Sequence, residues 1–181
     1  MTKVPSTKIL LYRIRKNKDP EAYGQIYDIY VKQIYRFVYY KISNHEEAED
    51  LTSEVFLKAW NYLNEGNEIK NIKALLYQLA RNLVIDLYRK RSSHREIKIE
   101  QIEIIQSPDE SNEKRLEDKL EHQKIVKNLD KLKNEYKEVI ILKYIEGLKT
   151  SEIAKIMNKS RASVRVLSHR ALKKLKFIME K

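Results

Sequence analysis

Apolar side chains recur every three to four residues along most of this 181-residue chain, which is the spacing of one face of an α-helix. Very little interrupts the pattern, because Gly and Pro, which end helices and form tight turns, occur only three times each. Turn-rich β-sandwiches and barrels need more of both. The sequence therefore predicts an all-α protein.

Three main helices are predicted in the first part of the chain. Asp19-Pro20 is a start signal, with Asp as the cap and Pro at the first helical position, and apolar residues then recur over Tyr23–Val38. A second helix begins near His45, with acidic residues in its first turn, and ends at Asn64–Asn67. A third runs from about Ile72 to Arg91.

Four more helices are predicted in the last part. One follows Asn112, and the next spans roughly Asn134–Ile145 and stops before Gly147. A third covers about Thr150–Met157, and the last starts after Ser160 and reaches about Phe177.

Charge divides the chain into three parts. Residues 1–92 hold 16 Lys and Arg against 11 Asp and Glu, residues 93–112 hold 2 against 5, and residues 113–181 hold 19 against 10. The middle part is acidic and has Ser, Asn and Pro near its ends, which is a linker composition. We therefore expect two small helical domains, 1–92 and 113–181, joined by a flexible linker over 93–112; packing of this segment on either domain is the alternative.

Composition excludes several classes of function. The net charge of +11 favours polyanions or anionic membrane surfaces as partners. There is no Cys, and the four His residues lack the spacing of metal ligands. No phosphate-binding Gly-rich loop, nucleophile elbow or defensible carboxylate pair occurs, so we expect no catalytic residues, no metal, no cofactor and no small-molecule substrate. The apolar run Ile9–Tyr12 is cut by Arg13 too early for a signal peptide, and we expect an intracellular protein.

The sharpest local pattern is a helix-turn-helix over Thr150–Leu167. Small Ala154 allows the two helices to cross closely, and Ile153, Met157, Val164 and Leu167 are expected between them. Asn158 tolerates the left-handed turn, and Ser160 can cap the second helix.

The second helix of such a motif enters the major groove of DNA by its N-terminal end. Its outward residues, and the basic residues that continue toward phosphates, are the candidate duplex contacts. They are Ser160, Arg161, Ala162, Ser163, Arg165, His169, Arg170 and Lys173. A helical hairpin with a solvated basic surface is the structural alternative.

Three segments resemble, in order, those of extracytoplasmic-function sigma factors of the sigma-70 family. Ala48–Trp60 is similar to their polymerase-binding helix, and Ala74–Arg91 to their minus-ten recognition helix. Glu135–Leu148 with the helix-turn-helix resembles their minus-thirty-five domain. The resemblance implies a factor that binds core RNA polymerase and directs transcription initiation at promoter DNA.

A polymerase-binding face is implied on the first of these helices. Its polar residues lie three to four positions apart and share one side of the helix; they are Glu47, Asp50, Ser53, Glu54 and Lys58. The resemblance implies a coiled coil of the largest polymerase subunit as the partner, with the polymerase flap as a second contact. An ordinary solvated face with internal salt bridges is the alternative.

Contacts to the melted minus-ten element are implied on the next helix and the loop before it. The candidates are Asn64, Asn67, Lys73, Arg81, Asn82, Arg89 and Lys90. Phe56 and Trp60 could stack on bases, but we assign them to the core, and we expect Asp86 to pair with an Arg one turn away.

Some positions depart from the family pattern. Lys133 stands where Pro is common, Lys149 occupies the usual cap position so that Thr150 is expected to cap instead, and Asn158 replaces Gly. Lys159 replaces an apolar residue, and Val166-Leu167 replaces a Ser-Arg pair. These changes bear on promoter preference more than on the fold.

The resemblance further implies a cytoplasmic, nucleoid-associated bacterial protein that a dedicated anti-sigma protein, often linked to the membrane, holds inactive. Two rival classes remain at this point. One is a stand-alone helix-turn-helix regulator with an N-terminal ligand-binding or dimerisation domain, and the other is a nucleic-acid-processing enzyme.

Overall fold

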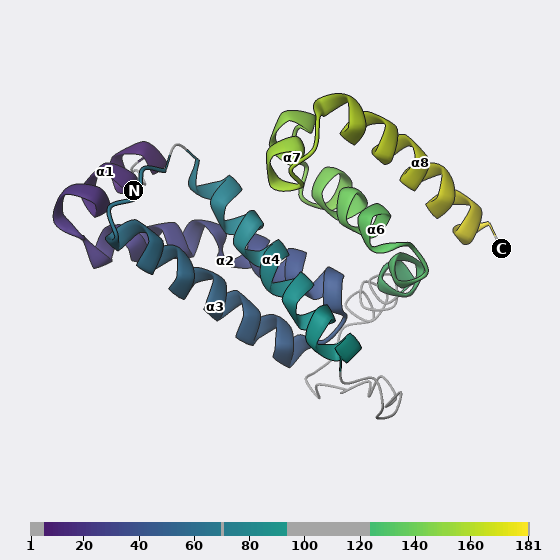
Figure 1. The fold of residues 1–181 in the computed structure, drawn as a ribbon, viewed down its shortest axis with the longest axis horizontal. Helices are drawn as coiled ribbons and strands as arrows, with labels where there is room; N and C mark the ends of the chain where they lie inside the picture. Colours follow the sequence, from purple (N-terminus) through teal and green to yellow (C-terminus); the bar gives the residue numbers. More distant parts are fainter. Residues whose placement is uncertain (1–5, 70, 94–123, 181) are drawn as a thin grey trace, which may run out of the picture.

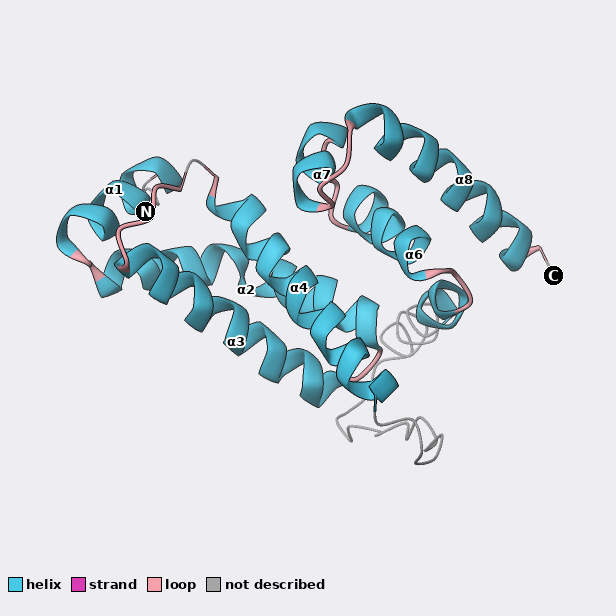
Figure 2. Ribbon diagram, viewed as in Figure 1, coloured by secondary structure: helices cyan, strands magenta, loops and turns pink. Residues whose placement is uncertain are grey.

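The structure is a computed structural model that describes residues 6–69, 71–93 and 124–180, and every regular element in these ranges is a helix (Figures 1 and 2). The helices are α1 (Thr7–Asn17), α2 (Pro20–Ile42), α3 (His45–Asn64), α4 (Ile72–Ser93), α6 (Asn134–Ile140), η1 (Ile141–Ile145), α7 (Thr150–Ile156) and α8 (Arg161–Met179). Residues 124–130 are also helical. The all-α prediction is confirmed, and the predicted acidic linker lies outside the described residues except for Ser93.

Helices α2, α3 and α4 pack around one apolar core, and each of the three contacts the other two (Figure 1). Asp19 caps α2 as expected, because its carboxylate accepts hydrogen bonds from the N–H groups of Glu21 and Ala22. The largest buried rings, Phe37 of α2 and Tyr77 of α4, meet edge to face with centroids 5.3 Å apart.

A further helix, α1, precedes these three, and the sequence-based prediction of three main helices missed it. Leu10 and Ile14 lie one turn apart on α1 and are fully buried. Lys18 ends the helix in a left-handed conformation, with φ of 48°, and its N–H bonds to the carbonyl of Ile14. Arg13, which interrupts the apolar run, lies on a half-buried side of the helix and pairs with Asp19 at 2.8 Å.

The second half contains α6, α7 and α8, with α8 packed along both of the others. The predicted helix Asn134–Ile145 exists, but its last five residues form a π-helix, η1. The N–H of Glu146 bonds to the carbonyl of Ile141 at 2.9 Å, and Gly147 then turns the chain with φ of 64°. Short π-helical segments of this kind are frequent at functional sites.

Glu146, at the end of η1, joins the two halves of the molecule. Its side chain is 1% exposed and accepts two hydrogen bonds from Arg36 of α2, at 2.6 and 2.9 Å. The hydroxyl of Tyr77 donates a third at 2.9 Å. Three donors satisfy a carboxylate that would be very costly to bury without partners.

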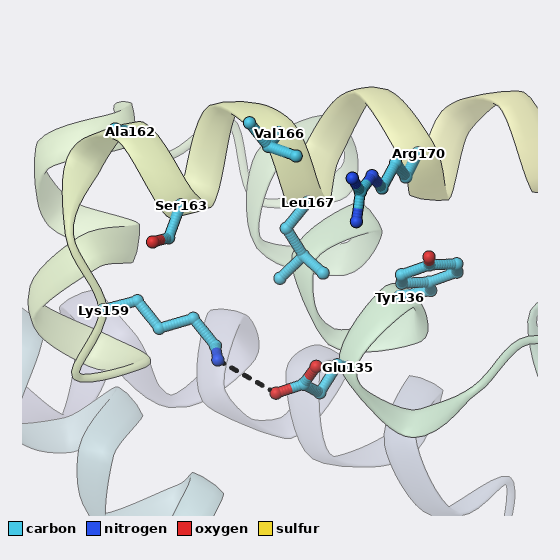
Figure 3. A pocket seen from close by; sticks show the side chains of 8 residues that line it. All are labelled: Glu135, Tyr136, Lys159, Ala162, Ser163, Val166, Leu167 and Arg170. Atoms are coloured by element: carbon cyan, nitrogen blue, oxygen red, sulfur yellow. Dashed lines mark ion pairs between the residues drawn. The ribbon is translucent and has the colours of Figure 1, made fainter.

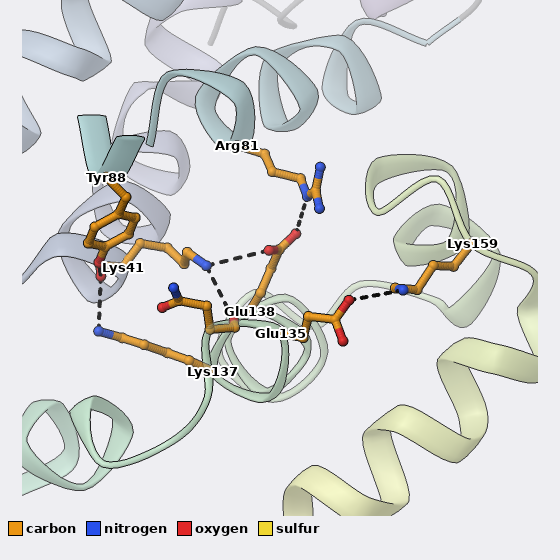
Figure 4. Close-up of polar contacts among 8 residues, drawn as sticks. Lys41, Arg81, Tyr88, Glu135, Lys137, Glu138 and Lys159 are labelled. Carbon is orange, nitrogen blue, oxygen red and sulfur yellow. Dashed lines mark hydrogen bonds and ion pairs between the residues drawn. The ribbon is translucent and has the colours of Figure 1, made fainter. Parts of the chain in front are cut away.

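Glu138 of α6 makes a second junction of the same kind (Figure 4). Its buried carboxylate lies 2.6 Å from Nε of Arg81 on α4 and 3.4 Å from Nζ of Lys41 on α2. Burial lowers the pKa of Lys41, while the neighbouring Glu138 opposes that shift. Nζ of Lys137 donates to the carbonyl of Lys41 at 2.9 Å, and Tyr88 donates to the same oxygen.

We predict that Glu146→Ala loosens the contact between the two halves, because it leaves Arg36 and the buried hydroxyl of Tyr77 without their acceptor. We expect the free energy of unfolding to fall by about 3 kcal/mol. This is the low end for breaking a buried ion pair, because Arg36 is 44% exposed. Small-angle X-ray scattering should show a larger radius of gyration, with helix content by circular dichroism unchanged.

Glu135→Ala is the matched control for this variant. It removes a carboxylate from the same stretch of chain, but Glu135 pairs with Lys159 inside the second half. The same radius of gyration for both variants would contradict the role assigned to Glu146.

Candidate nucleic-acid interface

The predicted helix-turn-helix is present as α7, a tight turn and α8. Asn158 adopts the left-handed conformation with φ of 52°, and the N–H of Lys159 bonds to the carbonyl of Ala154 at 2.9 Å. This hydrogen bond closes the end of α7 in the manner typical of a residue with positive φ after a helix.

The residues expected between the two helices are buried there. Ile153 and Val164 are fully buried, and Met157 and Ala154 are nearly so. Leu167 is half-buried and packs against the same core. The angle between α7 and α8 is therefore fixed by apolar packing.

One capping prediction is confirmed and one is wrong. The hydroxyl of Ser160 accepts a hydrogen bond from the N–H of Ser163 at 3.0 Å and caps α8 as predicted. Thr150 does not cap α7, because it is already the first helical residue and Lys149 occupies the cap position. Lysine has no acceptor, so Glu152 reaches back and accepts from the Lys149 N–H at 2.8 Å.

The outward face of α8 carries all of the predicted duplex contacts. Ser160, Arg161, Ala162, Ser163, Arg165, His169, Arg170 and Lys173 are exposed. The three Arg residues, His169 and Lys173 form no ion pair with another described residue, so their donors are free for an anionic partner. The structure brings this predicted set together on one helix.

A groove of about 500 Å³ runs beside this face, between α8 and the start of α6 (Figure 3). Ala162, Ser163 and Val166 line it from α8, and Tyr136 lies opposite. Lys159 closes one end through an ion pair with Glu135, 3.0 Å long. Sequence reasoning missed Tyr136 and the 50% exposed Val166 as part of this surface.

The predicted polymerase-binding face on α3 is mostly exposed. Asp50, Ser53, Glu54 and Lys58 are exposed, with Glu54 and Lys58 paired at 3.3 Å. Glu47 is instead half-buried, and its carboxylate forms an ion pair with Arg91 of α4. Leu57, 60% exposed beside Lys58, is an apolar residue of this surface that the sequence analysis passed over.

The predicted minus-ten residues fall into three groups along α4, a helix of 22 residues and therefore roughly 33 Å long. Asn64 and Asn67 lie before its start. Lys73 and Arg81 face the second half of the molecule and pair with Glu152 at 3.7 Å and Glu138 at 2.6 Å. The third group, Asn82, Arg89 and Lys90, is exposed.

Other residues near this region have structural contacts. The side chain of Asn71 accepts a hydrogen bond from the N–H of Ala74 at 3.0 Å, at the start of α4. Asp86 pairs with Arg89 at 3.7 Å, as predicted. Phe56 is buried, and half-buried Trp60 packs on Tyr23 with ring centroids 4.9 Å apart, so both belong to the core as assigned.

Comparison with known proteins matches both halves of the chain to one family. The model of Sigma-70 region 2 matches residues 26–94, and that of Sigma-70, region 4 matches residues 122–175. The sigma factor SigW of Bacillus subtilis is 30% identical over 173 residues, which cover 89% of this chain and 90% of SigW. This chain belongs to the extracytoplasmic-function sigma factors. It is therefore a DNA-binding initiation factor that works with core RNA polymerase at promoters.

Two further comparisons agree with this assignment. BldN of Streptomyces coelicolor is 28% identical to this chain over 162 residues. The match covers 87% of this chain and 60% of BldN. The structure of CnrH in complex with the cytosolic domain of CnrY superposes with a TM-score of 0.76 at 20% identity, over 97% of this chain and 98% of CnrH. The sigma factor RpoE of Bartonella quintana, solved in complex with the anti-sigma factor NepR, superposes with a TM-score of 0.70 at 24% identity. This superposition covers 87% of this chain and 96% of RpoE. At these identities the two structures show a shared fold.

Neither a membrane-spanning helix nor a metal-binding group is found in the part of this sigma factor that the structure describes. None of its helices there is long and apolar enough to cross a bilayer. No group of three or more His, Asp or Glu residues in the same ranges could hold a metal ion.

We predict that Asn158→Ala destabilises the sigma factor by about 1 kcal/mol, because alanine is strained in the left-handed region that asparagine tolerates. Asn158→Gly is the matched variant, and it should be as stable as the parent or slightly more stable. Urea denaturation followed by circular dichroism measures both, and equal stabilities of the two variants would show that the turn carries no backbone strain.

Proposed function

We propose that this sigma factor holds a promoter at two places while bound to core polymerase. Its second domain, 113–181, binds the minus-thirty-five element as duplex, and its first domain, 1–92, holds the melted minus-ten strand. The acidic segment 93–112 links them. The exposed, unpaired basic face at the start of α8 is the observation that carries this proposal.

The upstream contact depends on the N-terminal turns of α8. Arg161 and Arg165 are exposed and free of ion pairs, so each can donate to a guanine edge. Ser160, Ala162 and Ser163 lie beside them, and His169, Arg170 and Lys173 continue along the helix toward the phosphates.

The polymerase contact is assigned to the exposed face of α3 formed by Asp50, Ser53, Glu54 and Lys58, with Glu47 at its edge. Leu57, which is 60% exposed, adds apolar area to this polar surface, and protein interfaces combine apolar and polar area in this way. A coiled coil of the largest subunit with complementary charge fits such a face. The polymerase flap is the second contact, made by the C-terminal domain.

The downstream contact requires ion pairs to exchange. Arg81 and Lys73, assigned to the single strand, are held by Glu138 and Glu152 in this structure. A phosphate competes with those carboxylates for the same cations. Asn64, Asn67, Asn82, Arg89 and Lys90 complete the proposed surface, and three of these are already exposed.

Several finer features belong to this proposal. Chemistry is left to the polymerase, so the sigma factor contributes binding and is not itself an enzyme. It acts in the cytoplasm, on the nucleoid. An anti-sigma protein holds it inactive. RpoE, whose fold this chain shares, is solved in complex with the anti-sigma factor NepR, and this supports that expectation.

Run-off transcription with core polymerase on a library of genomic promoters tests the proposal. We expect specific start sites only when the sigma factor is added. A gel shift separates the alternative, because a stand-alone regulator binds its operator tightly without core enzyme. Failure to associate with core, or absence of any specific start site, would overturn the proposed function.

We predict that Arg165→Ala weakens transcription from promoters whose upstream element carries guanine at the contacted position, because a good Arg–guanine contact contributes about 1–3 kcal/mol. Changing that base pair should give no further loss in the variant. Lys131→Ala, in the turn before α6, removes the same charge from the same domain and serves as the control. Equal losses on all promoters would indicate a phosphate contact instead.

A further inference from the structure

The side of α8 that points away from the protein core is apolar near its N-terminus. The buried residues of α8 are Val164, Ser168 and Ala171, whose spacings of four and three place them on one face of the helix. Ala162 and Val166 are one turn apart and lie roughly opposite that face. Both are exposed, and Val166 is 50% exposed. The outermost side of the proposed recognition helix is therefore not formed by basic residues alone.

The neighbours of Val166 have other roles. Leu167 points from α8 toward α6 and packs against the core (Figure 3). The hydroxyl groups of Ser160 and Ser163 lie 2.8 Å apart, and Ser160 also accepts from the N–H of Ser163, so both serines are engaged in capping the helix. Arg165 is exposed and supplies donors on one side. Val166 presents only methyl groups beside it.

The side chain of Val166 is nearly fixed in direction. Valine branches at Cβ, and within a helix one rotamer accounts for about 90% of valine side chains. Val166 lies inside α8, Arg161–Met179, so this restriction applies to it. A partner that covers these methyl groups therefore removes little conformational entropy from the side chain.

The four bases differ in what they offer to such a group. All of them present hydrogen-bonding atoms in the major groove, but only thymine also presents an apolar group, its C5 methyl. A valine that covers a donor or acceptor removes that atom from water without giving it a partner, which costs free energy. Contact between a valine and the thymine methyl instead buries apolar surface on both sides. An outward valine on a recognition helix therefore favours thymine.

We propose that Val166 is a specificity-determining residue, which contacts the C5 methyl group of one thymine in the upstream promoter element. Ala162 has no atom beyond Cβ and allows the duplex to approach the same turn of α8. The inference rests on the proposed binding of duplex by α8. It adds a preference that the basic residues do not supply, because arginine favours guanine and phosphate contacts carry no direct sequence information.

Deoxyuridine tests this contact, because it lacks only the methyl group of thymidine and pairs with adenine in the same way. The complete sigma factor is bound to core polymerase, and promoter duplexes in which each upstream thymine is replaced in turn compete with the unmodified duplex. At one position we expect binding by the parent to weaken roughly fourfold, the effect of losing one buried methyl group.

Val166→Ala completes the comparison. It should bind the uracil and thymine duplexes equally at that position, because its contact is already lost, and alanine supports the helix at least as well as valine. Ile125→Ala is the control, because it removes an isoleucine that is 45% exposed in the same domain and should retain the response of the parent. The same loss in the parent and in Val166→Ala, or no loss at any thymine, would overturn the inference.

A second variant should change the preference itself. Val166→Ser replaces the methyl groups by a hydroxyl, which can accept a hydrogen bond from the amino group of cytosine. With a cytosine–guanine pair at the contacted position, this variant should bind severalfold more tightly than the parent. Replacing that cytosine by 5-methylcytosine should strengthen binding by the parent but not by Val166→Ser. If both proteins rank the duplexes alike, Val166 does not determine specificity.

The outcomes distinguish this inference from the proposed function. If the parent complex initiates at specific sites but is insensitive to every upstream thymine methyl, the inference fails and the function stands. If the parent complex neither binds nor initiates at any promoter, both fail.

Discussion

Two buried carboxylates, Glu138 and Glu146, connect the halves of this molecule, and their need for partners determines how the halves meet. An ionised carboxylate in the interior is tolerated only when cations and hydrogen-bond donors surround it. Arg36 and Tyr77 supply them for Glu146, and Lys41 and Arg81 supply them for Glu138 (Figure 4). These donors come from α2 and α4, so the first half holds the second in one orientation. The π-helical turn contributes by carrying Glu146 to the contact.

This arrangement gives the two proposed DNA surfaces different properties. The basic face of α8 is exposed and has no internal competitor among the described residues. By contrast, Arg81 and Lys73 on α4 already pair with carboxylates of the second half. Binding of duplex by α8 therefore requires no rearrangement inside the protein, whereas binding of a strand by those two residues costs the ion pairs that join the halves.

Short-range features were predictable, and long-range partners were not. The capped start of α2, the left-handed Asn158 and the cap at Ser160 each depend on residues within a few positions of one another. Helix α1 was missed because its short apolar run is crossed by Arg13, whose partner Asp19 lies beyond the helix. The ion pair between Arg81 and Glu138 joins positions 57 residues apart, and no local pattern indicates it. Likewise, the groove between α8 and the start of α6 exists only because those segments pack together.

The sequence by itself determined the helical class, the helix-turn-helix with its outward basic residues and the family, because periodicity, capping and motif order are local properties of the chain. Tertiary structure alone decided which charges are free and which are engaged. It separated the free Arg165 from the engaged Arg81, although both are arginines on amphipathic helices. The physical reason is that the availability of a charge depends on the carboxylate that the fold brings within hydrogen-bonding distance.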